Sequence, residues 1–230
     1  MKKILFLMAI ALSFIVISCS DNKDEPEPSK DHEYVDLGLP SGTLWATYNV
    51  GANTPEGYGD YFTWGETKPK DVYDMASNKW FSLCHDSIGT YWKVMKYNSI
   101  SSVGVVDNKT ELDPEDDAAY VNWGASWRMP TLAQQKELIR FCKWKWTTMN
   151  GVNGRLVTGP NGKTMFLPAA GFHEDSLFVS GTTSYWSRTL ADSYLYSAYC
   201  LVSDSVEVDY WNVIIRWVGM PVRAVRVSQN

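Results

Sequence analysis

Several residue patterns that catalysis requires are missing from this chain of 230 residues. Histidine occurs only at His32, His85 and His173, which are too scattered to predict a zinc site or a histidine-based catalytic triad. A phosphate-binding loop is excluded because Val157 stands where its first glycine is required. Ser41 lacks the Gly-x-Ser-x-Gly spacing of a hydrolase nucleophile. We therefore expect a protein that is not an enzyme.

The chain also lacks an excess of positive charge and a long apolar run. Its 21 Lys and Arg residues face 26 Asp and Glu residues, which gives a net charge of −5. Such a surface is unsuited to the phosphates of nucleic acids, so we expect no nucleic-acid partner. A membrane-spanning helix needs roughly 20 apolar residues. The apolar run at 4–17 is shorter and is interrupted by Ser13, so it does not predict a permanent span.

The N-terminus has the pattern of an export signal. Lys2 and Lys3 precede the apolar run, and the small residue Ser18 precedes Cys19. Residues 16–19, Val-Ile-Ser-Cys, resemble the lipobox of bacterial lipoproteins, which implies cleavage before Cys19 and acylation of that cysteine. Several acyl chains on one residue suffice for stable anchoring. We predict a signal peptide over 1–18 and a mature protein that is held on a membrane by Cys19.

Residues 19–33 follow as an acidic tether with Pro26 and Pro28 and no apolar side chains to bury, so we expect this segment to be disordered. The acidic run behind Cys19 also resembles the export tag that sends some Gram-negative lipoproteins to the outside of the cell. We expect a lipid anchor in the outer membrane, facing the cell exterior. The alternative is that the acids form only a solvated spacer.

Residues 34–230 have the composition of one globular domain, without a second linker. Two segments predict helices. In 113–120, Asp113 can act as the N-cap and Pro114 suits the first helical position. Thr131 and Gln134 have capping-box spacing ahead of apolar residues at broadly helical intervals.

The rest of the domain indicates short strands and many turns. Strands predicted at 155–158 and 164–167 flank a Gly-Pro-Asn-Gly turn. Alternating apolar and polar residues predict two more strands at 206–211 and 222–227. The sequence therefore predicts an α+β fold of mainly short antiparallel strands with two helices and long loops.

Three cysteines remain after Cys19, an odd number for an oxidising compartment. They are Cys84, Cys142 and Cys200. At most one disulfide can form among them, and the spacing does not set which pair.

The densest group of oxygen ligands lies between Asp107 and Asp117. One interpretation is helix capping with solvated acids. The other is a calcium site, because calcium takes roughly six to eight such ligands from flexible loops, although the spacing is not that of an EF-hand. The candidate ligands are Asp107, Glu115, Asp116 and Asp117. Apart from calcium, we expect no cofactor.

Aromatic residues are the other candidates for binding. Trp186, Tyr210 and Trp211 lie in late segments bordered by turns, where loops can present their flat faces to sugars or to protein partners. The alternative is that they belong to the core, as most tryptophans do.

A set of ordered strings extends over nearly the whole domain and resembles the Fibrobacter succinogenes major paralogous domain, a family of secreted and surface lipoproteins. The strings are YVDLGLPSGTLWAT (34–47), NVGA (49–52), EGYGDYFTWGET (56–67), DDAA (116–119), WRMPT (127–131), FLPAAG (166–171) and YWS (185–187). The resemblance implies a C-type lectin-like fold, related also to the formylglycine-generating enzymes. It supports the fold more than any activity.

The chain departs from these families in several places. The sugar-binding strings of calcium-dependent lectins are absent, and residues 209–212 resemble their Trp-Asn-Asp string only loosely; Asn212 joins the candidate ligand set on this basis. The cysteine pair of the formylglycine-generating enzymes is missing. Tyr48 stands where the family often has cysteine, which implies that a usual disulfide is lost and that Cys142 is unpaired. The string Val-Arg-Ala-Val at 222–225 replaces the commoner Val-Arg-Pro-Val.

We expect a surface-displayed, non-catalytic lipoprotein whose domain binds a glycan or another extracellular polymer, as in adhesion. A first alternative is a structural or assembly subunit, of the adhesin or pilus-tip type, that binds protein. A second is an enzyme of unknown type, since paired carboxylates such as Glu174 and Asp175 need little sequence context. The ligand and the oligomeric state do not follow from the sequence.

The lipid anchor gives the first testable prediction. Replacing Cys19 with serine removes the acylated thiol, so the protein should move from the membrane to the soluble fraction in cell fractionation. The domain should stay folded because the tether contributes nothing to its core. A Ser20→Ala variant serves as the control, and a Cys19→Ser protein that stays in the membrane fraction would contradict lipidation.

Overall fold

The computed structural model describes residues 32–175, 177–192, 194 and 196–227. Cys19, the predicted signal peptide and nearly all of the predicted tether lie outside these residues. In chain order the elements are β1 (Tyr34–Asp36), β2 (Thr43–Ala46), β3 (Phe81–Asp86), β4 (Gly89–Val94), the 3-10 helix η1 (Pro114–Asp116), α1 (Ala118–Trp123), α2 (Leu132–Phe141), β5 (Lys143–Met149), β6 (Val152–Thr158), β7 (Thr164–Pro168), β8 (Phe172–Glu174), β9 (Leu177–Val179), β10 (Thr183–Leu190), β11 (Ser197–Ser203), β12 (Val208–Ile215) and β13 (Val225–Val227).

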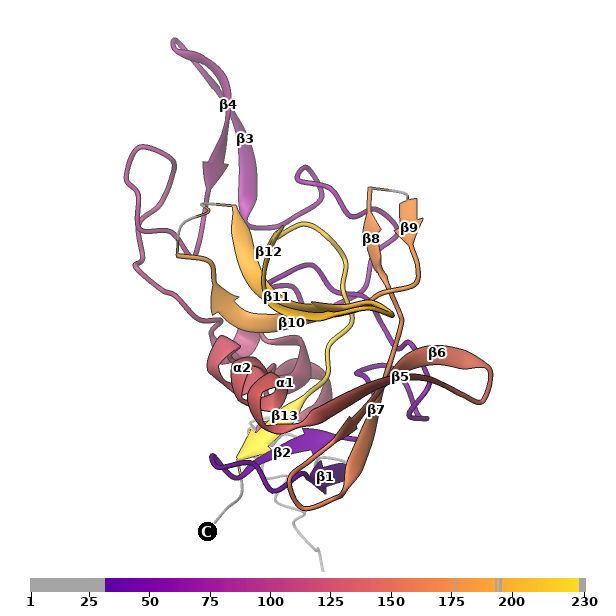
Figure 1. The fold of residues 1–230 in the computed structure, drawn as a ribbon. Coiled ribbons are helices and arrows are strands. Elements are labelled where there is room, and N and C mark those ends of the chain that lie inside the picture. The colour runs from indigo at the N-terminus through magenta and orange to yellow at the C-terminus, as the bar shows by residue number, and fades with distance from the viewer. Residues whose placement is uncertain (1–31, 176, 193, 195, 228–230) are drawn as a thin grey trace, which may run out of the picture.

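The strands form small antiparallel sheets (Figure 1). Two are hairpins, β3–β4 and β8–β9, and two are meanders, β5-β6-β7 and β10-β11-β12. The remaining sheet, which we call the terminal sheet, has the order β1-β2-β13 and joins the first strand to the last. With two α-helices beside these sheets, the predicted α+β class is confirmed.

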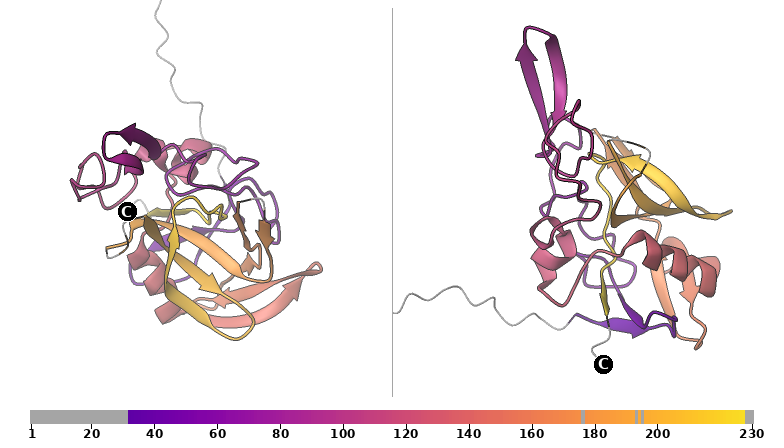
Figure 2. Two further views of the ribbon diagram at one scale, coloured as in Figure 1. Left: turned by 90° about the horizontal axis from the view of Figure 1, so that it is seen from above. Right: turned by 90° about the vertical axis from the view of Figure 1, so that its left-hand side faces the viewer.

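The domain has two distinct ends. The terminal sheet lies at one end, and the hairpins β3–β4 and β8–β9 lie toward the other (Figure 1). The β3–β4 hairpin also projects furthest from the terminal sheet when the molecule is turned (Figure 2, right). We call β3–β4 and β8–β9 the distal hairpins.

The predicted capping box of α2 is confirmed. The Thr131 hydroxyl accepts from the Gln134 backbone N–H (3.1 Å), and the Gln134 side chain accepts from the Thr131 N–H (2.9 Å). Leu138 on the same helix is buried in the core.

The prediction that Asp113 caps the helix at 113–120 is wrong. Asp113 makes no side-chain capping bond, and the residues after it form only the short η1. The helix begins later, at Ala118, because the carboxylate of Asp117 accepts from the N–H groups of Ala119 (2.9 Å) and Tyr120 (3.1 Å).

The strand predictions are correct in type and differ at their boundaries. The hairpin β6–β7 is confirmed, with Gly162 at φ +83° in its turn. The strand predicted from residue 206 begins at Val208, because Asp204 accepts from the N–H groups of Val206 and Glu207 and closes a turn there. The last strand is shorter than predicted and begins at Val225.

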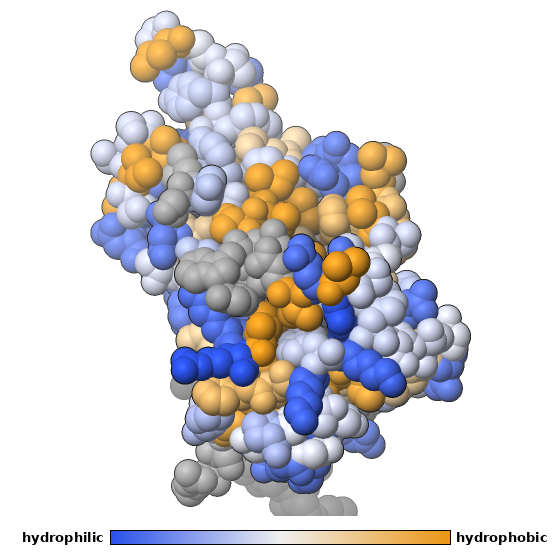
Figure 3. Space-filling view, in the orientation of Figure 1, coloured by the Kyte–Doolittle hydropathy of each residue, from blue (hydrophilic) through white to orange (hydrophobic). Residues whose placement is uncertain are grey.

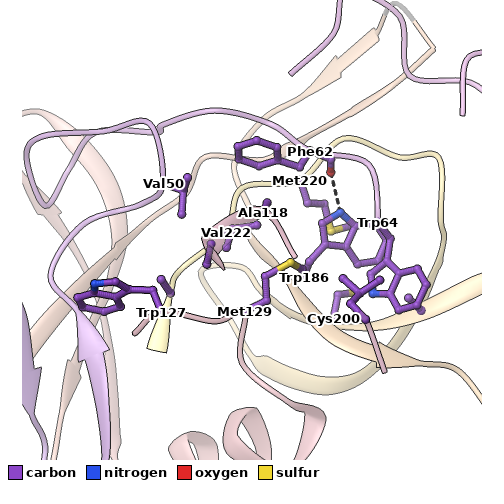
Figure 4. Close-up of a cluster of buried hydrophobic side chains, with 14 of the residues drawn as sticks. Val50, Phe62, Trp64, Ala118, Trp127, Met129, Trp186, Cys200, Met220 and Val222 are labelled. Carbon is purple, nitrogen blue, oxygen red and sulfur yellow. Dashed lines mark hydrogen bonds between the residues drawn. The ribbon is translucent and has the colours of Figure 1, made fainter. Parts of the chain in front are cut away.

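Two apolar clusters form the core. One surrounds Trp64 and Trp186, and the other packs α2 against β7 and the terminal sheet. The Trp186 indole N–H donates to the Phe62 carbonyl (2.8 Å), as Figure 4 shows. The Trp64 indole donates to the Ser187 carbonyl (2.8 Å). The indoles of Trp64 and Trp186 are therefore both satisfied by backbone from a distant part of the chain.

Arg223 is fully buried and connects three segments. Its Nε donates to Asn49 Oδ1 (2.9 Å), Nη1 to the Ala46 carbonyl (3.1 Å) and Nη2 to the Phe166 carbonyl (3.0 Å). The guanidinium thus ties the stretch before β13 to the end of β2 and to β7.

No disulfide links Cys84, Cys142 and Cys200 in the described structure. Cys84 lies in β3 and Cys142 follows α2, whereas Cys200 is buried in β11. None of the helices within the described residues is long and apolar enough to cross a membrane.

The cap of α1 provides a stability test. Asp117→Ala removes the cap and leaves the buried N–H of Met129, which donates to both carboxylate oxygens, without its acceptor. We expect a loss of about 3 kcal/mol in the free energy of unfolding, measured with denaturant. Glu115→Ala is the control because its side chain is 69% exposed, and it should change stability by about 0.5 kcal/mol at most. Equal effects of the two changes would refute the role of Asp117.

Candidate functional site

The structure corrects the prediction for Trp186. Its side chain is fully buried in the first of the two core clusters and offers no face to a ligand. The reason is that β10 lies against β11 with Trp186 opposite Cys200, another buried residue. The other three candidates, Tyr210, Trp211 and Asn212, belong to β12, but their side chains lie outside what the structure describes.

Asp107 serves the loop that precedes it. Its carboxylate accepts from the backbone N–H groups of Tyr97 (2.8 Å), Asn98 (2.9 Å) and Lys109 (3.2 Å). Burial opposes ionisation, but these hydrogen bonds outweigh it and lower the pKa of Asp107. The carboxylate is therefore engaged in holding the loop.

Asp117 is likewise engaged by backbone. It is fully buried, and burial raises the pKa of this carboxyl despite its hydrogen bonds from the Met129, Tyr120 and Ala119 N–H groups. Among the described residues, neither Asp107 nor Asp117 belongs to the group of acids whose ligand atoms converge, so the structure does not bring the four predicted calcium ligands together.

Asp113, Glu115 and Asp116 do come together, with ligand atoms within 4.8 Å of one another. Lys96 Nζ lies among them, 2.6 Å from both Asp113 and Asp116 and 3.6 Å from Glu115. An ammonium thus already occupies the place where the acids converge and offsets part of their charge. Of the predicted calcium ligands, only Glu115 and Asp116 share this cluster, and Asp113 was missed.

Asp116 is the most buried member of this acidic cluster. Burial tends to raise its pKa, but hydrogen bonds from Lys79 (2.8 Å), Lys96 (2.6 Å) and the Tyr97 hydroxyl (2.5 Å) prevail and lower it. Bonds from Lys109 and Lys96 also lower the pKa of Asp113. The cluster stands as a network of carboxylates and ammoniums.

A polar pocket of about 290 Å³ lies beside this network, and we call it the lysine pocket. It is lined by Glu66, Thr67, Lys68, Pro69, Lys70, Ser77 and Lys79. Lys79 belongs both to the pocket and, through Asp116, to the acidic cluster. Sequence reasoning missed these lysines, although their close spacing was a visible signal.

A second pocket of about 390 Å³ lies at the start of α2. It is lined by Glu111, Thr131, Leu132, Ala133, Lys136 and Thr189. Glu111 pairs with Arg188 (3.1 Å), and the Thr189 hydroxyl accepts from the Leu132 N–H (3.1 Å). The first contact joins the stretch before η1 to β10, and the second joins α2 to β10.

The distal hairpins carry exposed apolar side chains. Leu83, Ile88 and Tyr91 are exposed on and between β3 and β4, and the three residues of β9 are exposed as well. Figure 3 shows hydrophobic surface on both hairpins, along with further patches nearer the middle of that face. Exposed apolar groups of this kind are typical of contact surfaces when they gather in one region.

Comparisons with family models, with curated proteins and with solved structures give no significant match to this chain. The α+β class therefore rests on the structure, and the family resemblance stays a prediction.

The acidic cluster gives a test that depends on pH. Lys96→Met should lower the free energy of unfolding at pH 7 by about 3 kcal/mol, because buried Asp116 loses a partner. Carboxyls with lowered pKa contribute stability above their ordinary value of 3.8, and this contribution is lost as the pH falls through the folded-state value. The difference between wild type and variant should thus narrow below about pH 4.

Lys109→Met is the matched control, since this lysine is 44% exposed and its pair with Asp113 is a surface pair of at most about 1 kcal/mol. Denaturant titrations at several pH values measure both variants. A Lys96→Met deficit that is unchanged at pH 3 would show that packing, not charge, accounts for it.

Proposed function

We propose that this chain is a lipid-anchored recognition protein of the cell surface, whose non-catalytic domain binds a glycan or another extracellular polymer. The observation that carries the proposal is that the terminal sheet and the distal hairpins lie toward opposite ends of the domain. β1 follows directly on the predicted tether and lies in the terminal sheet, whereas the distal hairpins point the other way (Figures 1 and 2). A domain anchored through Cys19 would hold these hairpins away from the membrane.

The C-type lectin-like fold is part of the proposal. Three features support it: the first and last strands share the terminal sheet, α2 starts directly after the string Trp-Arg-Met-Pro-Thr, and long irregular stretches separate β2 from β3 and β4 from η1. Outer-membrane location and outward display follow from the predicted lipidation and acidic tether.

The two pockets favour a hydrated ligand. The residues that line them carry hydroxyl, carboxylate and ammonium groups beside apolar surface, and Pro69, Leu132 and Ala133 are among the lining residues. Sugars present many hydroxyl groups that pair with such side chains. The lysine pocket is the better candidate, because in the second pocket Glu111 is paired with Arg188 and the Thr189 hydroxyl already accepts from the Leu132 N–H.

A second candidate is a structural or assembly subunit that binds protein. It is favoured by the most exposed apolar side chains of the distal hairpins, Leu177 and Ile88, which are aliphatic and 69% and 89% exposed. Aliphatic side chains bury well against protein but lack the flat faces on which sugars stack.

A glycan array tests the first candidate. The full chain, purified in detergent, should bind a subset of glycans, and binding should survive a Leu177→Ser change in β9. Binding that is lost in Leu177→Ser, together with a stoichiometric protein crosslinked in cells, would favour the assembly role. If no glycan binds with or without calcium, the glycan proposal fails.

A further inference from the structure

The lysine pocket has a charge opposite to that of the chain. Among the side chains that line it, Lys68, Lys70 and Lys79 are opposed only by Glu66. The chain as a whole has a net charge of −5. A concentrated positive lining in an acidic protein attracts anions locally, even where the overall field repels them.

Glu66 organises the pocket and is not available to a ligand. It is only 9% exposed. Its carboxylate accepts from the Lys79 backbone N–H (2.9 Å) and from the Thr63 hydroxyl, and it pairs with Lys70. The negative charge of Glu66, which would repel an anion, is therefore offset by Lys70, and its carboxylate is held in place at the side of the lysine pocket.

Two of the ammoniums are fixed in place by the protein. Lys70 pairs with Glu66 and donates to the Ser77 carbonyl (2.7 Å), and Lys79 is held by Asp116 (2.8 Å) and lies over the Trp80 ring. An ammonium carries more N–H donors than these contacts use, so each retains a donor for a ligand. Because their side chains are already ordered, binding costs little conformational entropy.

Lys68 supplies the uncompensated charge. It is exposed on the rim and takes part in no ion pair within the described part of the chain. Next to it, the Thr67 carbonyl is tied to α1 by Asn122 Nδ2 (3.0 Å), which fixes the backbone that carries the lysine. The backbone beside Lys68 is thus held in position, while the ammonium of Lys68 is available to a ligand.

The size of the pocket limits the ligand. At about 290 Å³ it lies near the lower end of the range for small-molecule sites, roughly 300 to 1,000 Å³. That space suits one charged ring and not a long segment of polymer. The hydroxyl of Thr67 and the ring of Pro69 line it together with the lysines, which suits a ligand with both hydroxyl and apolar faces.

We propose that the lysine pocket binds the carboxylate of an acidic sugar, such as a uronic acid in an extracellular glycan, with Lys68, Lys70 and Lys79 as the donors. This inference rests on the proposed glycan-binding function and names its ligand class. The carboxylate accepts from the ammoniums, while the sugar ring lies over Pro69 and beside Thr67.

The test uses a ligand pair that differs in the charge of the carboxyl groups and in the methyl groups that mask it. Binding of an oligogalacturonide and of its methyl ester to the full chain in detergent is measured by calorimetry. The acid should bind, the ester should bind at least about fivefold more weakly, and added salt should weaken only the acid. Lys68→Ala should weaken acid binding about fivefold, and Lys68→Glu should weaken it further.

Lys145→Ala is the matched control, because it removes one exposed lysine from β5, away from the lining of the pocket. It should leave acid binding unchanged, and circular dichroism should show all variants folded. Equal binding of acid and ester, equal weakening by Lys68→Ala and Lys145→Ala, or no binding of the acid would overturn the proposal. Glycan-array binding of neutral sugars alongside such a result would preserve the proposed function and remove only this site.

Discussion

The buried guanidinium of Arg223 is the interaction on which the arrangement of the domain depends. A cation removed from water is costly unless its donors are satisfied, and here two backbone carbonyls and one amide oxygen accept from it. Two of those acceptors come from the end of β2 and from Asn49 just after it, and the third comes from β7, far from both in the chain. The terminal sheet, the β5-β6-β7 meander and the loop at Asn49 can satisfy this charge only in their observed relative positions.

The sequence predicts local structure well where the signal is local. The α2 capping box and the β6–β7 turn depend on residues three or four positions apart, and both are found as predicted. The cap of α1 was misassigned because Asp113 and Asp117 both precede a plausible helix start. What selects Asp117 is the N–H of Met129, which approaches it only in the folded chain.

The candidate sites depend on contacts that spacing does not reveal. The residues next to Trp186 in the sequence do not distinguish a buried tryptophan from an exposed one. Only the pairing of β10 with β11 places its side chain in the core. The acids after Asp107 looked like metal ligands because Lys79 and Lys96, which approach Asp116, lie 37 and 20 positions away. For Tyr210, Trp211 and Asn212, and for the anchor at Cys19, the predictions stay as they were.

The terminal sheet has a consequence for how such a domain can be reused. Because β1 and β13 flank the same four-residue strand, the described fold starts and stops within one small sheet, with Tyr34 opposite one end of β2 and Val227 opposite the other. A unit of this form can be inserted into a single surface loop of another protein, or repeated in series, without stretching its host. Evolution can therefore move it between architectures as one module, with its hairpins still facing away from the point of attachment.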